Sequence, residues 1–148
     1  GGCVTGSRFS HRKVFAHIAK AVGCRALIVD YARAPEHPHP SQVDECAKIY
    51  RWLLDQGIRP EHIATVGDSA GGNLCTTVVL KLRATACPSQ PQSIRNAAER
   101  MRAAGVECRC DVFPEMQHVF HFMAGNAPDA DDALATLANW ARPKLGRG

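Results

Sequence analysis

The stretch VGDSAGGNL, residues 66–74, places one serine between glycines at the spacing G-x-S-x-G. A serine hydroxyl is a weak nucleophile until a base removes its proton and an acid orients that base. Gly67 and Gly71 would let the chain make a strained turn that exposes Ser69. The amide of Ala70, at the start of the following helix, could then donate to an oxyanion. The motif predicts a nucleophile at Ser69; the alternative is a turn of small residues that only packs a helix.

The base must be one of seven histidines. His118 lies in the loop after a predicted strand and follows Ser69 in the chain, which is the order that a strand–turn–helix nucleophile requires. We therefore expect His118 to be the base, while His121 lies nearby but off the motif. His37 stands among prolines in APEHP, where a role in shaping the turn is the better interpretation.

The elements that must position these residues alternate along the chain. Short apolar, β-rich runs predict buried strands at 25–31, 62–66 and 106–113. Helical periodicity predicts helices over 12–22, 42–56 with Ser41 as N-cap, the stretch after the glycines (NLCTTVVLKLR), 93–105 and 129–142. This order indicates an α/β fold in which a mainly parallel sheet is flanked by helices, as one domain over 1–148.

Four phrases in this order, GGCVTGS, DYARAPEHPHP, GDSAGGNL and PEMQHVFHFM, resemble bacterial esterases of the hormone-sensitive-lipase-like branch of the α/β hydrolases. The resemblance implies an α/β-hydrolase fold and an ester hydrolase that needs no metal or cofactor. It implies Ser69 as nucleophile, His118 as base, and the amides of Gly1, Gly2 and Ala70 as the oxyanion hole.

The chain departs from the family in three places. It begins after the histidine that normally precedes the two glycines, the first strands are absent, and strands are missing after the nucleophile helix, with a deletion junction expected near 84–92. No Asp or Glu occurs between Asp68 and Glu99, so the triad acid is unknown. Asp111 and Glu115 are acidic and close to His118 in sequence, and could substitute only by coincidence.

Bulk properties exclude several classes of protein. The net charge of +4 comes from scattered residues, so no nucleic-acid footprint is indicated, and no apolar run is long enough for a transmembrane helix. The seven cysteines fit no zinc pattern and are expected as small buried hydrophobes in a reducing cytosol. We expect a cytoplasmic protein, with peripheral membrane association as an alternative, and the missing initiator Met indicates a trimmed chain or one that begins within a larger gene. The oligomeric state stays open.

Three functions follow from these patterns. The first is hydrolysis of a small-molecule ester through an acyl-enzyme at Ser69, with activity possible even without an identified acid. The second is an inactive remnant of an esterase, acting as a binding module or existing as a truncated product. A nucleotide-binding domain ranks last, because GDSAGGN lacks both the Lys-Ser/Thr of a P-loop and the G-x-G-x-x-G spacing.

Overall fold

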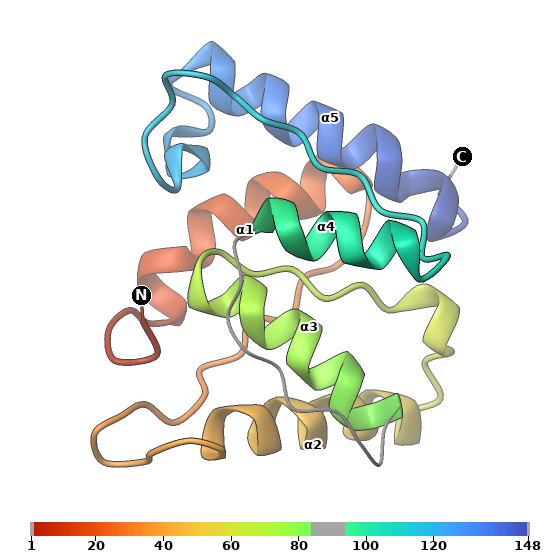
Figure 1. Ribbon diagram of the computed structural model, residues 1–148. Helices are drawn as coiled ribbons and strands as arrows, with labels where there is room; N and C mark the ends of the chain where they lie inside the picture. The colour runs from red at the N-terminus through yellow and green to blue at the C-terminus, as the bar shows by residue number, and fades with distance from the viewer. Residues whose placement is uncertain (1, 84–93, 148) are drawn as a thin grey trace.

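The computed structural model describes residues 2–83 and 94–147 (Figure 1). Its α-helices are α1 (Arg8–Val22), α2 (Ser41–Asp55), α3 (Ala70–Arg83), α4 (Ile94–Ala103) and α5 (Pro128–Lys144), and its 3-10 helices are η1 (Pro60–His62) and η2 (Phe120–Met123). Every helix predicted from the sequence is present. The expected junction at 84–92 and the predicted oxyanion residue Gly1 lie outside the described residues.

The ends of the helices differ from the predictions where capping was misread. α1 begins four residues earlier than predicted, at Arg8 rather than at 12. A capping box explains this start: the Ser7 hydroxyl accepts from the Ser10 amide, and the Ser10 hydroxyl accepts from the Ser7 amide. The N-cap of α2 is Pro40, so the prediction of Ser41 as N-cap is wrong; Ser41 is the first helical residue.

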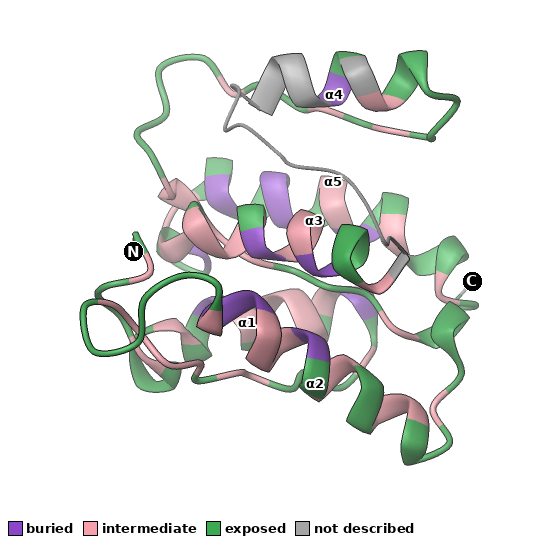
Figure 2. Ribbon diagram, turned by 60° about the horizontal axis from the view of Figure 1, so that its bottom comes forward, coloured by how far each residue is buried: buried purple, intermediate pink, exposed green. Residues whose placement is uncertain are grey.

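Most of the buried residues lie on two pairs of helices. α2 packs on α3, and α1 packs on α5 and η2. In Figure 1, α1 and α5 lie above, α2 and α3 lie below, and extended segments run between them. Figure 2 shows that the buried residues lie on the helices, apart from Ala124. The core cluster between α2 and α3 is small: Val43, Ala47, Leu74 and Val78.

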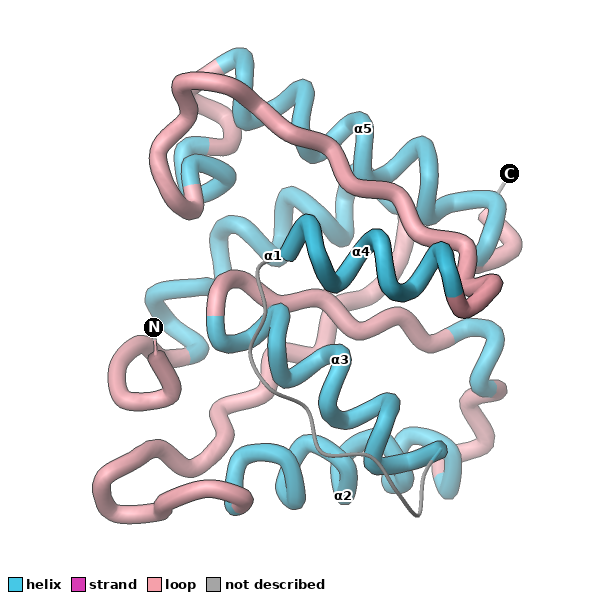
Figure 3. Tube along the Cα trace, in the orientation of Figure 1, coloured by secondary structure: helices cyan, strands magenta, loops and turns pink. Residues whose placement is uncertain are grey.

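The predicted strands are not formed within the described residues, so that part of the prediction is wrong. Residues 25–31, 63–66 and 106–113 are drawn as loops in Figure 3, and no backbone hydrogen bond among the described residues joins these segments to one another. Some of their apolar side chains are exposed: Leu27 56%, Val66 43%, Val106 44% and Val112 53%. Others are half-buried: Ile28, Val29, Ile63 and Phe113.

The reason is that a strand needs a neighbour. A parallel ladder forms only when a second strand lies about 4.8 Å away, and such sheets need cover on both faces. Each segment keeps the apolar, β-branched composition that suits a buried strand, but its amides and carbonyls find no partner strand among the described residues. The helices are therefore present without a hydrogen-bonded sheet among the described residues.

No helix in the described part of the chain is both long and apolar enough to cross a membrane.

Candidate active site

The turn that carries Ser69 is strained as the motif predicts. Ser69 has a φ of 49°, in the left-handed region that non-glycine residues rarely adopt, and it is exposed. Gly67 is required next to it, because an added Cβ would lie 2.3 Å from the Gly71 carbonyl carbon and 2.4 Å from its oxygen. The two glycines thus have different roles: Gly67 permits close approach to the start of α3, whereas a Cβ on Gly71 would meet nothing within 4 Å.

The start of α3 leaves one amide without an acceptor. The Asp68 carbonyl accepts from the amides of Gly71 (2.7 Å) and Gly72 (3.3 Å), and the Ser69 carbonyl accepts from Asn73 at 3.2 Å. The amide of Ala70 has no hydrogen-bond partner among the described residues. A first-turn amide next to an exposed serine is the kind of donor that an oxyanion can use.

The segment around His118 is also strained. Among the described residues, the left-handed region holds the non-glycine residues Cys3, Ser69, Glu115 and Val119. Two of these flank His118, with φ of 69° at Glu115 and 57° at Val119, and η2 begins directly after Val119. Such outliers persist only where surrounding contacts hold them, and they cluster at functional sites.

A cavity of about 260 Å³ is lined by both the expected nucleophile, Ser69, and the expected base, His118. Its lining residues come from three parts of the chain: His11 from α1, Asp68 and Ser69 from the nucleophile turn, and His118, Val119 and Phe122 from the segment that leads into η2. No hydrogen bond joins the Ser69 hydroxyl to a histidine in the described part of the molecule. In unliganded sites such bonds are often long, so shared lining is the relevant observation.

Neither of the two acidic residues near His118 forms an ion pair with it in the described part of the chain. Asp111 forms an ion pair with Arg109 at 2.9 Å, on an exposed stretch. Glu115 is exposed, and neither carboxylate forms an ion pair with His118. Within residues 2–83 and 94–147, the histidine that does pair with a carboxylate is His11, whose Nε2 lies 3.1 Å from Asp68 Oδ1.

Sequence reasoning missed His11. It stands in GSRFSHRK with no local pattern that marks it, and its partner Asp68 lies far along the chain. Only the packing of α1 beside the nucleophile turn brings the two together. His121, which the sequence placed off the motif, is half-buried, and burial lowers its pKa while the Asp68 carboxylate opposes that change.

The expected oxyanion residue Gly2 is not among the residues that line the Ser69 cavity. Gly2 is exposed with a φ of 65°, and the next residue, Cys3, is tied to the rest of the chain by its carbonyl, which accepts from the Ala34 amide at 3.0 Å. Gly1 lies outside the described residues. Ala70 is not in the cavity lining either, but it follows Ser69 directly and its amide has no hydrogen-bond partner among the described residues.

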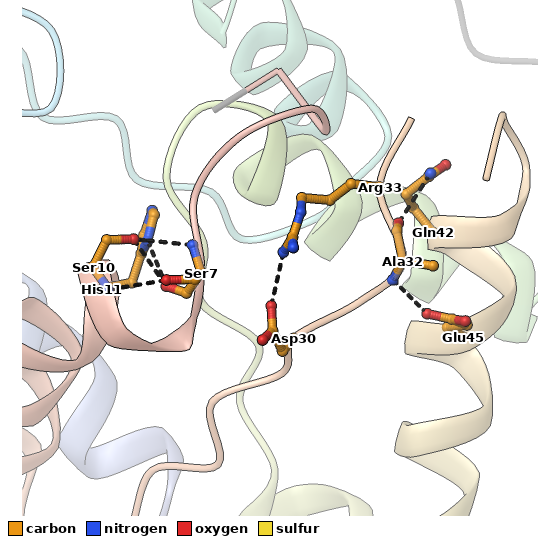
Figure 4. A network of polar contacts seen from close by, with 8 residues as sticks. All are labelled: Ser7, Ser10, His11, Asp30, Ala32, Arg33, Gln42 and Glu45. Carbon is orange, nitrogen blue, oxygen red and sulfur yellow. Dashed lines mark hydrogen bonds and ion pairs between the residues drawn. The ribbon is translucent and has the colours of Figure 1, made fainter. Parts of the chain in front are cut away.

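The loop of residues 30–40 is fastened to α2 rather than to the cavity (Figure 4). The Ala32 amide donates to Glu45 Oε2 at 2.7 Å, and the buried Gln42 amide donates to the carbonyls of Ala32 (3.1 Å) and His37 (2.6 Å). Asp30 pairs with Arg33 at 2.9 Å. The contact through the His37 carbonyl supports a structural rather than a catalytic role for this segment.

A second hollow of about 330 Å³ follows the same loop and is lined by Asp30, Tyr31, Ala32, Arg33, Glu36 and His37. Burial raises the pKa of Tyr31 to about 12, with Cys3 contributing in the same direction. This hollow is not lined by an expected nucleophile and base together, so the Ser69 cavity is the better candidate for an active site.

The cysteines are less buried than predicted. The described ones, which leave out Cys87, are all free and half-buried. Cys3 and Cys46 pack against the core cluster between α2 and α3, and burial raises the pKa of Cys46 to about 11. No group of three metal-ligating side chains gathers in the described ranges.

Comparison with known proteins identifies the family of the chain. A family described as alpha/beta hydrolase fold matches residues 1–94. An esterase of Acinetobacter venetianus is 39% identical over 83 residues, which is 56% of this chain and 27% of that protein. Bovine hormone-sensitive lipase is 40% identical over 88 residues, or 57% of this chain and 12% of the lipase.

A solved structure shows the same likeness over nearly the whole chain. The crystal structure of an esterase from the bacterial hormone-sensitive lipase family superposes with a TM-score of 0.88 at 27% identity, covering 99% of this chain and 74% of the other. In the sequence comparison, the match spans only about a quarter of the length of the Acinetobacter esterase. The chain keeps the family's backbone path even where the ladder is not formed, and it belongs to the hormone-sensitive-lipase-like branch of the α/β hydrolase family.

Proposed function

We propose that this chain is a carboxylic ester hydrolase in which Ser69 is the nucleophile and His118 the general base. The observation that carries the proposal is the shared cavity: Ser69 and His118 come from distant parts of the sequence and line the same hollow of about 260 Å³. The names of the relatives, esterase and hormone-sensitive lipase, support ester chemistry in such a site.

The proposed reaction has two steps. The Ser69 oxygen attacks the ester carbonyl carbon while His118 takes the hydroxyl proton, and the oxyanion is stabilised by the Ala70 amide. The intermediate collapses to an acyl-enzyme as His118 returns the proton to the leaving alcohol. Water, deprotonated by His118, then attacks the acyl carbon, and Ser69 leaves with the proton as the acid is released.

His118 lacks a carboxylate partner among the described residues, and this sets an expectation for the rate. In the serine-protease triad, loss of the acid's function lowers turnover about 10⁴-fold while leaving catalysis above the rate in water. We therefore expect slow turnover but competent formation of a covalent adduct. Labelling by a fluorophosphonate, which needs one attack and no deacylation, is the more sensitive assay.

The test compares the wild-type chain with Ser69→Ala and His118→Ala. We expect the wild type to take up one phosphonyl group at Ser69, His118→Ala to be labelled about 10² times more slowly or worse, and Ser69→Ala not to be labelled. His39→Ala, which removes an exposed histidine that does not line the cavity, is the matched control and should react like the wild type. Equal labelling of Ser69→Ala would contradict the proposal.

The second candidate is a non-catalytic binding module. The observation that favours it is the set of exposed apolar side chains on the three unpaired extended segments, together with the missing partner for His118. A folded wild-type chain, shown by circular dichroism, that stays unlabelled and hydrolyses no ester would favour this candidate over the first.

A further inference from the structure

His11 lines the Ser69 cavity, so its role must be separated from that of a base. Its Nε2 lies 3.1 Å from Asp68 Oδ1. A carboxylate only accepts, so this ion pair favours the form of the ring that carries a proton on Nε2. That nitrogen therefore has no lone pair to offer the Ser69 hydroxyl while the pair is intact.

The other ring nitrogen is occupied as well. Nδ1 lies 2.9 Å from the Ser10 hydroxyl and 3.1 Å from the Ser7 carbonyl, and both partners belong to the capping box that starts α1 (Figure 4). The Ser10 hydroxyl itself lies 2.9 Å from the Ser7 carbonyl. The helix cap thus fixes the orientation of the ring. Both ring nitrogens already have polar partners, so neither is free to accept the Ser69 proton.

The faces and edges of the ring are packed too. The Phe15 ring, one turn further along α1, is stacked with it at a centroid distance of 6.2 Å and an interplanar angle of 21°. The Phe122 ring from η2 meets it in an edge arrangement at 5.0 Å and 81°. His11 therefore contacts α1, the residue before the nucleophile, and the segment that follows His118.

We propose that His11 is a positioning residue for the Ser69 site: it holds Asp68, and through it the strained nucleophile turn, against α1, and it is not a second base. The inference rests on the proposed role of Ser69. The Asp68 carbonyl accepts hydrogen bonds from the amides of Gly71 and Gly72, and the Asp68 carboxylate pairs with His11. Both the backbone and the side chain of Asp68 are therefore fixed.

The side chains of His11 and Asp68 are 21% and 26% exposed, so solvent screens the pair only in part. Loss of an ion pair at this exposure should slow phosphonylation of Ser69 by about tenfold at most. The loss should fall on the rate of the chemical step with little change in the concentration of reagent that half-saturates it, because His11 does not need to bind substrate to hold the turn.

The experiment measures the rate constant of fluorophosphonate labelling in the wild type, His11→Ala, His11→Gln, Asp68→Asn and the double variant His11→Ala/Asp68→Asn. Glutamine can place an amide N–H near the position of Nε2, so His11→Gln should stay within about threefold of the wild type. His11→Ala alone should lower the labelling rate by up to about tenfold. Added to Asp68→Asn, it should lower the rate little further, since the two residues act as a unit. His17→Ala, on the same helix but outside the cavity lining, is the control and should change the rate less than twofold.

Circular dichroism with urea unfolding accompanies each variant, and the nitrogen-15 spectrum of the His11 ring is recorded near neutral pH. A protonated Nε2 whose signal shifts in Asp68→Asn supports the pair. An unprotonated Nε2, or a folded His11→Ala that is labelled as fast as the wild type, overturns the inference while the proposed function stands. A wild type that is not labelled overturns both, so the two failures are distinguishable.

Discussion

Replacing Gly67 by alanine tests the nucleophile turn at the point where it is tightest. The added Cβ would lie 2.3 Å from the Gly71 carbonyl carbon, 2.4 Å from its oxygen and 2.8 Å from the Gly72 nitrogen. All three atoms are backbone, so no flexible side chain can move away. An ordinary contact needs the start of α3 to retreat by about 1 Å.

That displacement should affect both the stability of the fold and the rate of Ser69 labelling. Overpacking of a fixed backbone costs about 1–3 kcal/mol, and three clashing atoms place Gly67→Ala near 3 kcal/mol. A shift of about 1 Å at a reacting group can cost about 10² in rate. We therefore expect Gly67→Ala to lower the free energy of unfolding by about 3 kcal/mol and the rate of Ser69 labelling about 10²-fold.

Gly71→Ala is the matched control, four residues further along. Its Cβ would meet nothing within 4 Å, and the residue lies in the first turn of α3. Alanine is preferred to glycine in helices, so this variant should be neutral or more stable by up to about 1 kcal/mol. Urea unfolding and the labelling rate measure both variants. A Gly67→Ala protein as stable and as reactive as Gly71→Ala would refute this account of the turn.

Three further predictions concern the loop on α2 and the size of the cavity. Gln42→Ala removes two hydrogen bonds from a buried amide and should cost about 1–3 kcal/mol in urea unfolding, whereas Gln56→Ala, at an exposed helix end, should stay within about 0.5 kcal/mol. Because the fold raises the pKa of Tyr31 to about 12 from its ordinary value near 10, the folded state holds the phenol proton more tightly. Stability should be full below about pH 10 and fall toward about pH 12, and Tyr31→Phe should flatten that loss; an equal decline in both proteins would contradict it. A cavity of about 260 Å³ is below the common range of about 300–1,000 Å³ for small-molecule sites, so butyrate esters should be cleaved faster than palmitate esters, and a preference for palmitate would be evidence against this cavity as the acyl site.

The helices and the nucleophile turn could be predicted because their information is local. The periodicity of 93–105 and 129–142 specifies amphipathic helices, and both form close to the predicted ranges, as α4 and α5. The strain at Ser69 follows from glycines within two residues of it. Even here the caps were misjudged, since Ser7 and not a later residue starts α1.

Neither the lack of strand pairing among the described residues nor the His11–Asp68 pair could be predicted, because each depends on parts of the chain that are distant in sequence. Residues 25–31 have the composition of a strand, but a ladder is a property of two segments, and composition cannot show that the neighbour is missing. His11 carries no local mark either, and it becomes significant only when α1 packs beside the nucleophile turn. The family resemblance supplied roles for Ser69 and His118 and was silent on a residue that belongs to no motif.

The central claim is that Ser69 and His118 act together in one cavity, and the most direct measurement is the stoichiometry and site of fluorophosphonate labelling, read by mass spectrometry. Our account predicts one adduct per wild-type chain, located on Ser69, with a rate that collapses in His118→Ala and is unchanged in His39→Ala. A folded wild-type chain without an adduct, or with an adduct on another residue, would contradict it.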